Sequence, residues 1–171
     1  MEKIAVDMDG VLADVYHQFI QMHFEESGVL LQEKDLEGLT EYEAFPHILK
    51  HVHTPGFFRT APLISDSQEI LEKLNHKYEV FIVSAATEFP LSLAEKQAWL
   101  NEHFPFIDWK HMVFCGSKEI IKADIMIDDH FKNLDFFEGQ TFLFTQPHNT
   151  HKVNGKHKRV HSWKDIEHFL I

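Results

Sequence analysis

The sequence predicts an α/β domain built around a mostly parallel sheet, and two observations favour this class. Short apolar runs rich in β-branched residues alternate along the chain with amphipathic segments of helical length. Such an order places parallel strands in one sheet, joined by right-handed helical crossovers. A length of 171 residues, with 44% hydrophobic and 25% charged residues, suits one globular domain or one with a small insert. This composition excludes a disordered or fibrous chain.

The first strand and the first helix are expected close to the N-terminus. The apolar run 3–6 ends in acidic residues and Gly10, which is typical of a buried strand. A helix is then expected from Val11 to about Gly28, because the apolar residues of this stretch fit an irregular helical period.

The next stretch is predicted to be irregular before the regular alternation resumes. Residues 32–62 are polar and interrupted by glycine and proline, so we expect short helices and loops there. An amphipathic helix is expected over 67–77, with Asp66 or Ser67 as its N-cap.

The second half of the chain is predicted to supply most of the sheet. Apolar, β-branched runs predict four strands, and two further segments have helical period. The strands are expected at 79–84, 112–115, 124–127 and 141–144, and the helices at 91–104 and 163–170. The His- and Lys-rich segment 148–161 is expected to be a mobile surface loop.

Charge and cysteine content narrow the possible partners and location. Sixteen basic and 27 acidic residues give a net charge of −11, which argues against binding polymeric nucleic acid. No apolar run approaches the roughly 20 residues that span a bilayer, and the N-terminus resembles no secretory signal. Cys115 is the single cysteine, so a reducing cytoplasm is the expected setting.

Polar side chains follow three of the predicted strands. Asp7 and Asp9 follow the first strand at a spacing that turns both carboxylates to one side, and Ser84 ends a middle strand. Asp128 and Asp129 follow a later strand. The ligand site of an open parallel sheet lies beyond the carboxyl ends of its strands, so we expect these groups to converge there.

These residue types together suit a phosphate group and a divalent cation. Clustered carboxylates repel one another unless a hard cation such as Mg²⁺ binds between them. Lys118 and Ser84 could supply the positive charge and hydroxyl that a phosphate needs. Each of these motifs alone is common as a solvated turn, a helix cap or a surface charge. Their occurrence together in one chain favours a binding site for phosphate and a cation. His130, after the acidic pair, is expected to begin a helix or to support the site.

Four motifs resemble those of the haloacid dehalogenase-like (HAD) phosphatases. The run Asp-Met-Asp-Gly-Val-Leu-Ala-Asp at 7–14 resembles the first motif, and Ser84 matches the second. Lys118 matches the third motif, and Asp128-Asp129 match the fourth. The resemblance implies a three-layer, Rossmann-like core formed by 1–15 and 68–171, with a small helical cap, 16–67, inserted after the first strand.

Further segments resemble one group of these phosphatases, the 5′(3′)-deoxyribonucleotidases. Pro55-Gly56-Phe57-Phe58 matches a cap segment of that family, and the spacing from Lys118 to Asp128 is also reproduced. A late Phe-x-x-x-His-Asn pattern ends at Asn149. The chain departs from the animal members at Val15-Tyr16, where they have an aromatic residue directly after the first motif, and at Ser84-Ala85-Ala86, where they have Thr-Ser-Pro.

The resemblance implies a Mg²⁺-dependent phosphomonoester hydrolase acting on (deoxy)nucleoside monophosphates. Asp7 would be the nucleophile that forms an aspartyl-phosphate, and Asp9 the general acid and base. Ser84 and Lys118 would bind the phosphoryl oxygens. Mg²⁺ would be held by Asp7, the backbone carbonyl of Asp9, and Asp128 or Asp129.

Several alternatives stay open at this point. Phe57 and Phe58 would either contact a nucleobase or only pack the cap onto the core. The substrate could instead be another small phosphate ester, such as a sugar phosphate, and a non-catalytic HAD-like binding domain is a third reading. Base preference, 5′ or 3′ position and oligomeric state, a homodimer included, are left undecided.

Overall fold

The computed structural model describes residues 1–171 and is centred on a six-stranded parallel sheet in the order β3-β2-β1-β4-β5-β6. The predicted α/β class is therefore confirmed, with every strand pair parallel. The strands are β1 (Lys3–Val6), β2 (Glu79–Ser84), β3 (Met112–Phe114), β4 (Ile125–Asp128), β5 (Gln140–Phe144) and β6 (Lys158–Val160).

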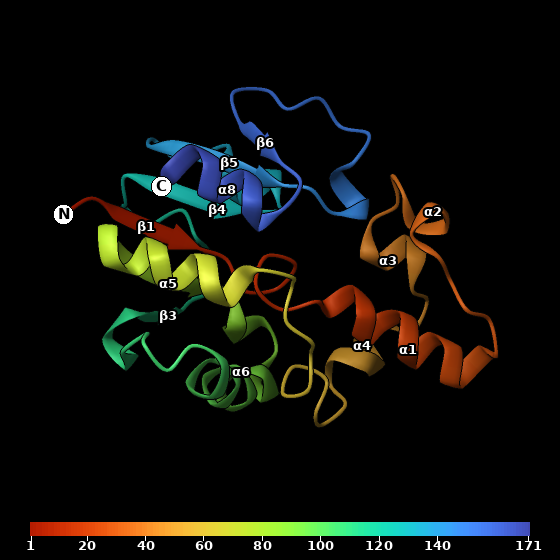
Figure 1. The fold of residues 1–171 in the computed structure, drawn as a ribbon. Helices are drawn as coiled ribbons and strands as arrows, with labels where there is room; N and C mark the ends of the chain where they lie inside the picture. Colours follow the sequence, from red (N-terminus) through yellow and green to blue (C-terminus); the bar gives the residue numbers. More distant parts are fainter.

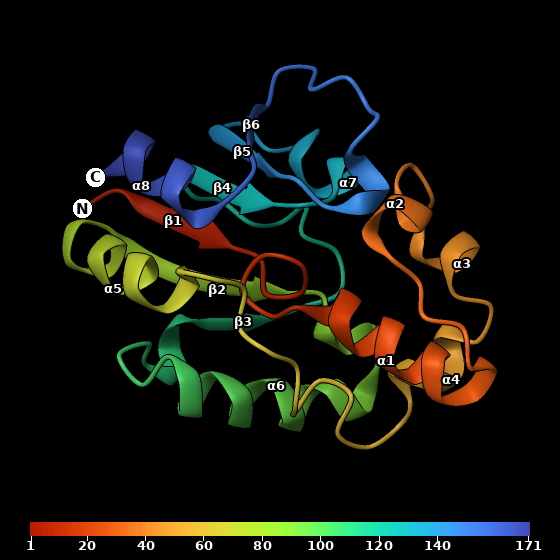
Figure 2. The same cartoon turned by 45° about the vertical axis from the view of Figure 1, so that its right-hand side comes forward.

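Helices cover both faces of this sheet. Helices α5 (Ser67–Lys77) and α8 (Trp163–Leu170) lie side by side over one face (Figure 1), and α6 (Pro90–His103) adds Trp99 and Leu100 to the same core. The short helix α7 (Phe131–Leu134) packs on β4 and β5 from the other face (Figure 2). Three 3₁₀ turns complete this part: η1 (Ala86–Glu88), η2 (Trp109–His111) and η3 (Pro147–Asn149).

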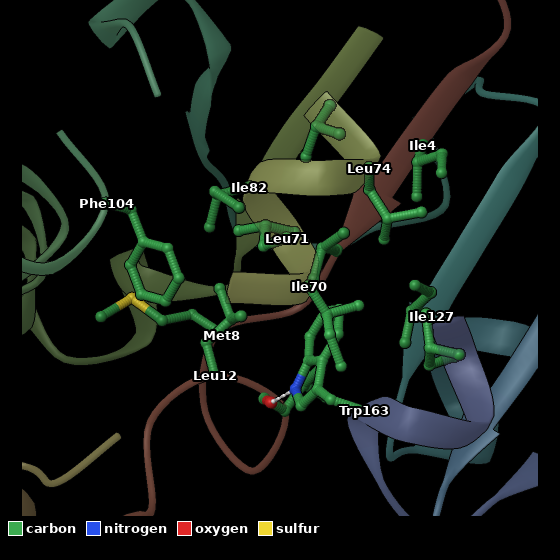
Figure 3. Close-up of a cluster of buried hydrophobic side chains, with 14 of the residues drawn as sticks. Ile4, Met8, Leu12, Ile70, Leu71, Leu74, Ile82, Phe104, Ile127 and Trp163 are labelled. Atoms are coloured by element: carbon green, nitrogen blue, oxygen red, sulfur yellow. Dashed lines mark hydrogen bonds between the residues drawn. The ribbon is translucent and has the colours of Figure 1, made fainter. Parts of the chain in front are cut away.

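Strand side chains alternate between two apolar clusters, as a parallel sheet covered on both faces requires. Ile4 and Val6 point into the larger cluster, whereas Ala5 points into the smaller one. Within the larger cluster, the indole of Trp163 is fully buried and its Nε1–H donates to the carbonyl of Val11 over 2.7 Å (Figure 3). This bond ties α8 to the loop that follows β1.

Four helices lie apart from the sheet, beyond the carboxyl ends of its strands (Figures 1 and 2). Their apolar side chains form a separate cluster that includes Tyr16, Phe19, Phe45 and both Phe57 and Phe58. The helices are α1 (Val15–Ser27), α2 (Glu33–Leu36), α3 (Glu41–Ala44) and α4 (Ile48–Val52). The short helices predicted within 32–62 are confirmed.

Local hydrogen bonds correct the predicted start of α1, whereas α5 spans Ser67–Lys77 as predicted. Helix α1 begins at Val15 rather than Val11, because the amides of Leu12 and Ala13 both donate to the carbonyl of Met8 in a tight turn. Helix α5 has Asp66 at its N-cap position, but neither Asp66 nor Ser67 caps it through a side-chain hydrogen bond. The Ser67 hydroxyl is instead buried without a partner.

The prediction of a mobile surface loop over 148–161 is wrong at both ends of the segment, whereas residues 150–156 are mostly exposed, as expected. The segment contains the buried side chains of His148, Asn149 and His157, and it ends in strand β6. The guanidinium of Arg159 holds it together by donating to the Asn149 side chain and to the carbonyls of Asn149 and Lys152. The polar composition of this segment suggested that it would be mobile, whereas its hydrogen bonds to Arg159 fix its backbone.

No helix in the structure combines the length and apolarity that crossing a lipid bilayer would require.

Replacing Trp163 by Phe tests the tie between α8 and the loop after β1. Trp163→Phe removes the indole N–H and leaves the buried Val11 carbonyl without this donor, so we expect the free energy of unfolding to fall by about 1–3 kcal/mol. Urea denaturation measures the change. Trp109→Phe is the matched control, because that indole is 67% exposed, and it should stay within about 0.5 kcal/mol of the parent. Equal stability of both variants would contradict the assigned role.

Candidate active site

The candidate site lies where the order of strands along the chain reverses direction. From β1 the chain proceeds to β2 and β3 on one side of the sheet, and then crosses to β4, β5 and β6 on the other. Such a reversal leaves a crevice beyond the carboxyl ends of the two central strands. Asp7 follows β1 and Asp128 ends β4, and Val6 pairs with Ile127, so the sheet register itself brings the two carboxylates together.

A tight turn after β1 sets the directions of Asp7 and Asp9. Met8 between them is fully buried in the core, which leaves both carboxylates to face the crevice. Gly10 has φ +77°, and a Cβ atom built there would lie 2.5 Å from Oδ2 of Asp129. Only glycine allows this turn to approach the Asp129 side chain so closely.

Lys118 neutralises the buried acidic cluster. Its Nζ donates to Asp7 Oδ1 over 2.6 Å and to Asp128 Oδ2 over 2.7 Å, with all three side chains almost completely buried. Burial opposes the charge on Lys118, but Asp128 and Asp7 outweigh it and raise the lysine pKa above its usual value. For Asp7, burial outweighs the attraction of Lys118 and raises the pKa to about 6.

The two adjacent aspartates differ in their partners. Asp128 accepts hydrogen bonds on both oxygens, from Lys118, from the side chain of Asn133 and from the amide of His130. These donors outweigh burial and hold the pKa of Asp128 below its usual value. Asp129 has a buried Oδ1 with no partner, and burial raises its pKa well above the usual value.

This donor set fits a divalent cation. Oxygens of Asp7, Asp128 and Asp129 all lie within 4.8 Å of one another, and Oδ1 of Asp129 and Oδ1 of Asp9 are buried without partners. Three buried carboxylates beside one lysine leave excess negative charge, and hard oxygen ligands of this kind suit Mg²⁺.

A second buried lysine lies on the other side of the crevice. Lys96 Nζ donates to Asp9 Oδ2 over 2.6 Å and to Ser84 Oγ over 3.0 Å, and it stands 4.6 Å from the ring centre of Phe58. We did not predict this residue from the sequence. The sequence does contain a signal for a buried lysine, because Lys96 lies at helical spacing from Ser92 and Trp99, which share the buried face of α6.

The structure thus brings together all the polar residues predicted for the site. Asp7, Asp9 and Lys118 line one pocket with Ser84, whereas Asp128 and Asp129 lie behind its floor. Asn133 and Lys96 join this polar end, and neither had been singled out in the sequence.

The other end of the pocket is apolar. Phe57 and Phe58 line it and are also packed into the apolar cluster of α1–α4, so their contact with a nucleobase stays a prediction. The carboxylate of Glu95 holds their loop by accepting hydrogen bonds from the amides of Gly56, Phe58 and Arg59. Val15, Phe19, Ile48, Val52 and Phe89 complete the apolar lining.

The segment after β5 supports the turn that carries Asp129. The side chains of His148 and Asn149 both donate to the Asp129 carbonyl, over 3.0 and 2.8 Å, and Gln146 donates to the carbonyl of Gly10. The late His-Asn pair of the sequence therefore holds the backbone of the acidic motif.

His130 occupies the N-cap position of α7 without capping it through its side chain, and it lines the pocket. Burial opposes its protonation, but the carboxylates of Asp129 and Glu41 outweigh burial and raise the His130 pKa to about 10. Burial lowers the pKa of His148, beside it. The partners of His148 suit the neutral ring, with Nε2–H donating to the Asp129 carbonyl and Nδ1 accepting from the Tyr16 hydroxyl.

Comparison with known proteins agrees with this geometry. The family model described as "5′ nucleotidase, deoxy (Pyrimidine), cytosolic type C protein" matches residues 1–171. Proteins of Bacillus subtilis strain 168 and of Bacillus phage SPbeta, each described as a 5′(3′)-deoxyribonucleotidase, are 40% identical over 171 residues, covering 98% of this chain and 98% of each relative.

Solved structures with this fold include HAD-type hydrolases of low sequence identity. A haloacid dehalogenase-like hydrolase from Streptococcus pneumoniae superposes with a TM-score of 0.63 at 15% identity, covering 100% of this chain and 99% of the other. A HAD-hydrolase from Bacillus subtilis, bound to magnesium, has a TM-score of 0.61 at 13% identity, covering 99% and 98%. With this fold, and with sequence similarity along its whole length, the chain belongs to the family of the 5′(3′)-deoxyribonucleotidases.

Proposed function

We propose that this protein hydrolyses the phosphate ester of deoxynucleoside monophosphates, with Asp7 as nucleophile and Asp9 as general acid and base. One observation carries the proposal. Asp7 and Asp9 face one pocket in which each carboxylate is paired with a different buried lysine, and apolar and aromatic side chains line the rest of that pocket, with the ring of Phe58 4.6 Å from Lys96 Nζ. A phosphate fits the charged end, and a nucleobase fits the aromatic end.

The reaction proceeds in two displacements on Asp7. A carboxylate oxygen of Asp7 attacks phosphorus while the ester oxygen leaves and takes a proton from Asp9, which yields an aspartyl-phosphate. A water molecule then attacks this phosphorus and transfers its proton to Asp9, which releases inorganic phosphate and restores both carboxyl groups. Asp9 begins the cycle protonated: its Oδ2 accepts from Lys96, and its Oδ1, which has no partner in the protein, holds the proton that is given to the leaving oxygen and regained from water.

Lysine and serine side chains bind the phosphoryl group. Lys118 and Ser84 keep their predicted roles, and we add Lys96, whose Nζ lies within hydrogen-bond distance of Ser84 Oγ. A phosphoryl oxygen bound by Ser84 would therefore also be close to the Lys96 ammonium. Two fixed cations offset the negative charge that develops on the phosphoryl oxygens in the transition state.

Mg²⁺ is the proposed cofactor, held by Asp7, the backbone carbonyl of Asp9 and Asp129. Asp129 is preferred over Asp128 because its Oδ1 has no partner, whereas both oxygens of Asp128 are occupied. Asp128 then acts by positioning Lys118. When bound, Mg²⁺ lowers the repulsion between the anionic nucleophile and the anionic substrate.

The helices beyond the sheet are proposed to form a cap, 16–67, over a core made of 1–15 and 68–171. The separate apolar cluster of α1–α4 supports this division. Phe57 and Phe58 are proposed to contact the base, since both line the apolar end of the pocket. Location in the cytoplasm and a homodimeric assembly stay predictions.

A substrate panel tests the function. We expect deoxynucleoside monophosphates to be hydrolysed well ahead of sugar phosphates, with activity lost to a chelator and restored by Mg²⁺. Asp7→Asn is the matched variant, because it keeps the size of the side chain but removes the nucleophile, and its kcat should fall at least about 10³-fold. Phosphate release measures both. Turnover of sugar phosphates alone would discard the substrate, and a folded, fully active Asp7→Asn would discard the mechanism.

Phe58→Leu tests the base-binding end of the pocket. The substitution keeps apolar volume but removes the ring, so KM for a deoxynucleoside monophosphate should rise by about tenfold, as expected for a lost base–aromatic contact. The control substrate is 2-deoxyribose 5-phosphate, which has the phosphate and the sugar but no base. Steady-state kinetics on both substrates give the comparison. An equal rise of KM for both would mean that Phe58 acts on the phosphate end, beside Lys96.

Thermal unfolding with and without Mg²⁺ tests the metal site through its pH dependence. The pKa of Asp7 is raised from 3.8 to about 6, so the metal-free folded protein holds a proton that the unfolded chain releases. The contribution of Asp7 to the free energy of unfolding therefore falls as pH rises between these values. Mg²⁺ binds the deprotonated carboxylates, so the increase in Tm that it causes should be larger at pH 7.5 than at pH 5. Asp129→Asn should show little increase at either pH; an unchanged increase would exclude Asp129 as a ligand.

A further inference from the structure

Four side chains join the cap helices to the turn that carries Asp129. Glu41, at the start of α3, places Oε1 3.4 Å from Nε2 of His130. Tyr16, in α1, has its hydroxyl 3.0 Å from Nδ1 of His148. The imidazoles of His130 and His148 stack on each other, with ring centres 4.2 Å apart and planes within 14°. We call this set, Glu41, Tyr16, His130 and His148, the Glu41 bridge.

The ring geometry of the Glu41 bridge argues against a metal site. Glu41, His130 and His148 have potential ligand atoms within 4.8 Å of one another. However, the lone pairs of imidazole nitrogens lie in the ring planes, so two parallel stacked rings cannot direct them at a single ion. Both nitrogens of His148 are also engaged, with the Asp129 carbonyl and with the Tyr16 hydroxyl. Hydrogen bonding between protein groups is the chemistry that this arrangement supports.

The position of the Glu41 bridge relates it to the substrate pocket. Glu41 and His130 line the pocket together with Asp7 and Lys96 at its polar end and Phe58 at its apolar end. His130 directly follows Asp129, and His148 donates to the Asp129 carbonyl. The Glu41 bridge therefore connects the cap wall of the pocket with the backbone that holds the acidic cluster.

A second connection holds the cap on its other side. The Glu95 carboxylate of α6 accepts three backbone amides from the loop of Phe57 and Phe58, and the indole of Trp99 donates to the carbonyl of Ala61. The cap thus contacts the core through α6, through the Glu41 bridge, and through the segment after α2, where the Gly38 amide donates to the Pro147 carbonyl and Glu37 pairs with His151. The first attachment involves backbone groups, whereas the second consists mainly of side chains that could separate.

We propose that the Glu41 bridge sets the position of the cap wall over the bound base, so that Glu41 and Tyr16 are positioning residues for nucleotide substrates. The proposal rests on the proposed function for its substrate class. Without the carboxylate of Glu41, helix α3 would lose its contact with the turn that carries Asp129, and the part of the pocket wall that Glu41 forms would no longer be held beside the phosphate site.

Kinetics of a double-mutant cycle test this role. Glu41→Gln keeps the shape of the side chain but removes its charge, and KM for a deoxynucleoside monophosphate should rise by about tenfold while KM for 2-deoxyribose 5-phosphate stays unchanged. His130→Asn should have the same effect, and the double variant should be no worse than either single variant. Glu37→Gln is the matched control: Glu37 also pairs with a histidine, His151, on the same side of the cap, but it does not line the pocket.

Additive effects of the two substitutions, or an equal loss with both substrates, would overturn the proposal. Amide hydrogen exchange gives a readout that does not depend on activity. Residues 33–52 should exchange several-fold faster in Glu41→Gln and in Tyr16→Phe than in the parent or in Glu37→Gln, and unchanged exchange would also overturn the proposal. If the parent protein hydrolyses no nucleotide, the proposed function fails, while the exchange measurement still decides whether the Glu41 bridge holds the cap.

Discussion

Two lysine ammonium groups are buried at the carboxyl ends of the central strands, and the architecture of the site depends on neutralising them. Lys118 and Lys96 are 5% and 2% exposed. Burying an unpaired charge is strongly unfavourable, so each lysine needs carboxylates at hydrogen-bond distance. Lys118 donates to Asp7 and Asp128, which lie at the ends of adjacent parallel strands, and Lys96 donates to Asp9. Removing one partner would leave a buried charge uncompensated, so the strand ends and α6 are required to meet at this point.

The same requirement explains the support around the acidic turn. The buried carboxylates need hydrogen-bond donors to offset their negative charge. The side chain of Asn133 and the amide of His130 both donate to Asp128. The carbonyl of Asp129 accepts hydrogen bonds from His148 and Asn149, and Asn149 in turn accepts from Arg159. His148 and Asn149 are thereby buried, because their side chains satisfy the backbone of the site.

Helix α6 holds groups at both ends of the pocket through hydrogen bonds. Glu95 and Lys96 are neighbours in sequence, yet Glu95 holds the loop of the aromatic wall while Lys96 reaches Asp9 and Ser84. The distance between the charged and apolar ends is therefore set by one rigid element. This arrangement suits a substrate that has an anionic group at one end and a flat ring at the other.

The sequence by itself determined the α/β class, the parallel strands and the acidic residues that follow them, because strand patterning and the residues at strand ends are local features. Lys96 emerged only from the tertiary structure, since its partner Asp9 is 87 residues away. The burial of His148, Asn149 and His157, the different environments of Asp128 and Asp129, and the contact of Glu41 with His130 also depend on segments that are distant in the sequence. Burial and hydrogen-bond partners depend on which distant segments the fold brings together, and local composition does not contain that information.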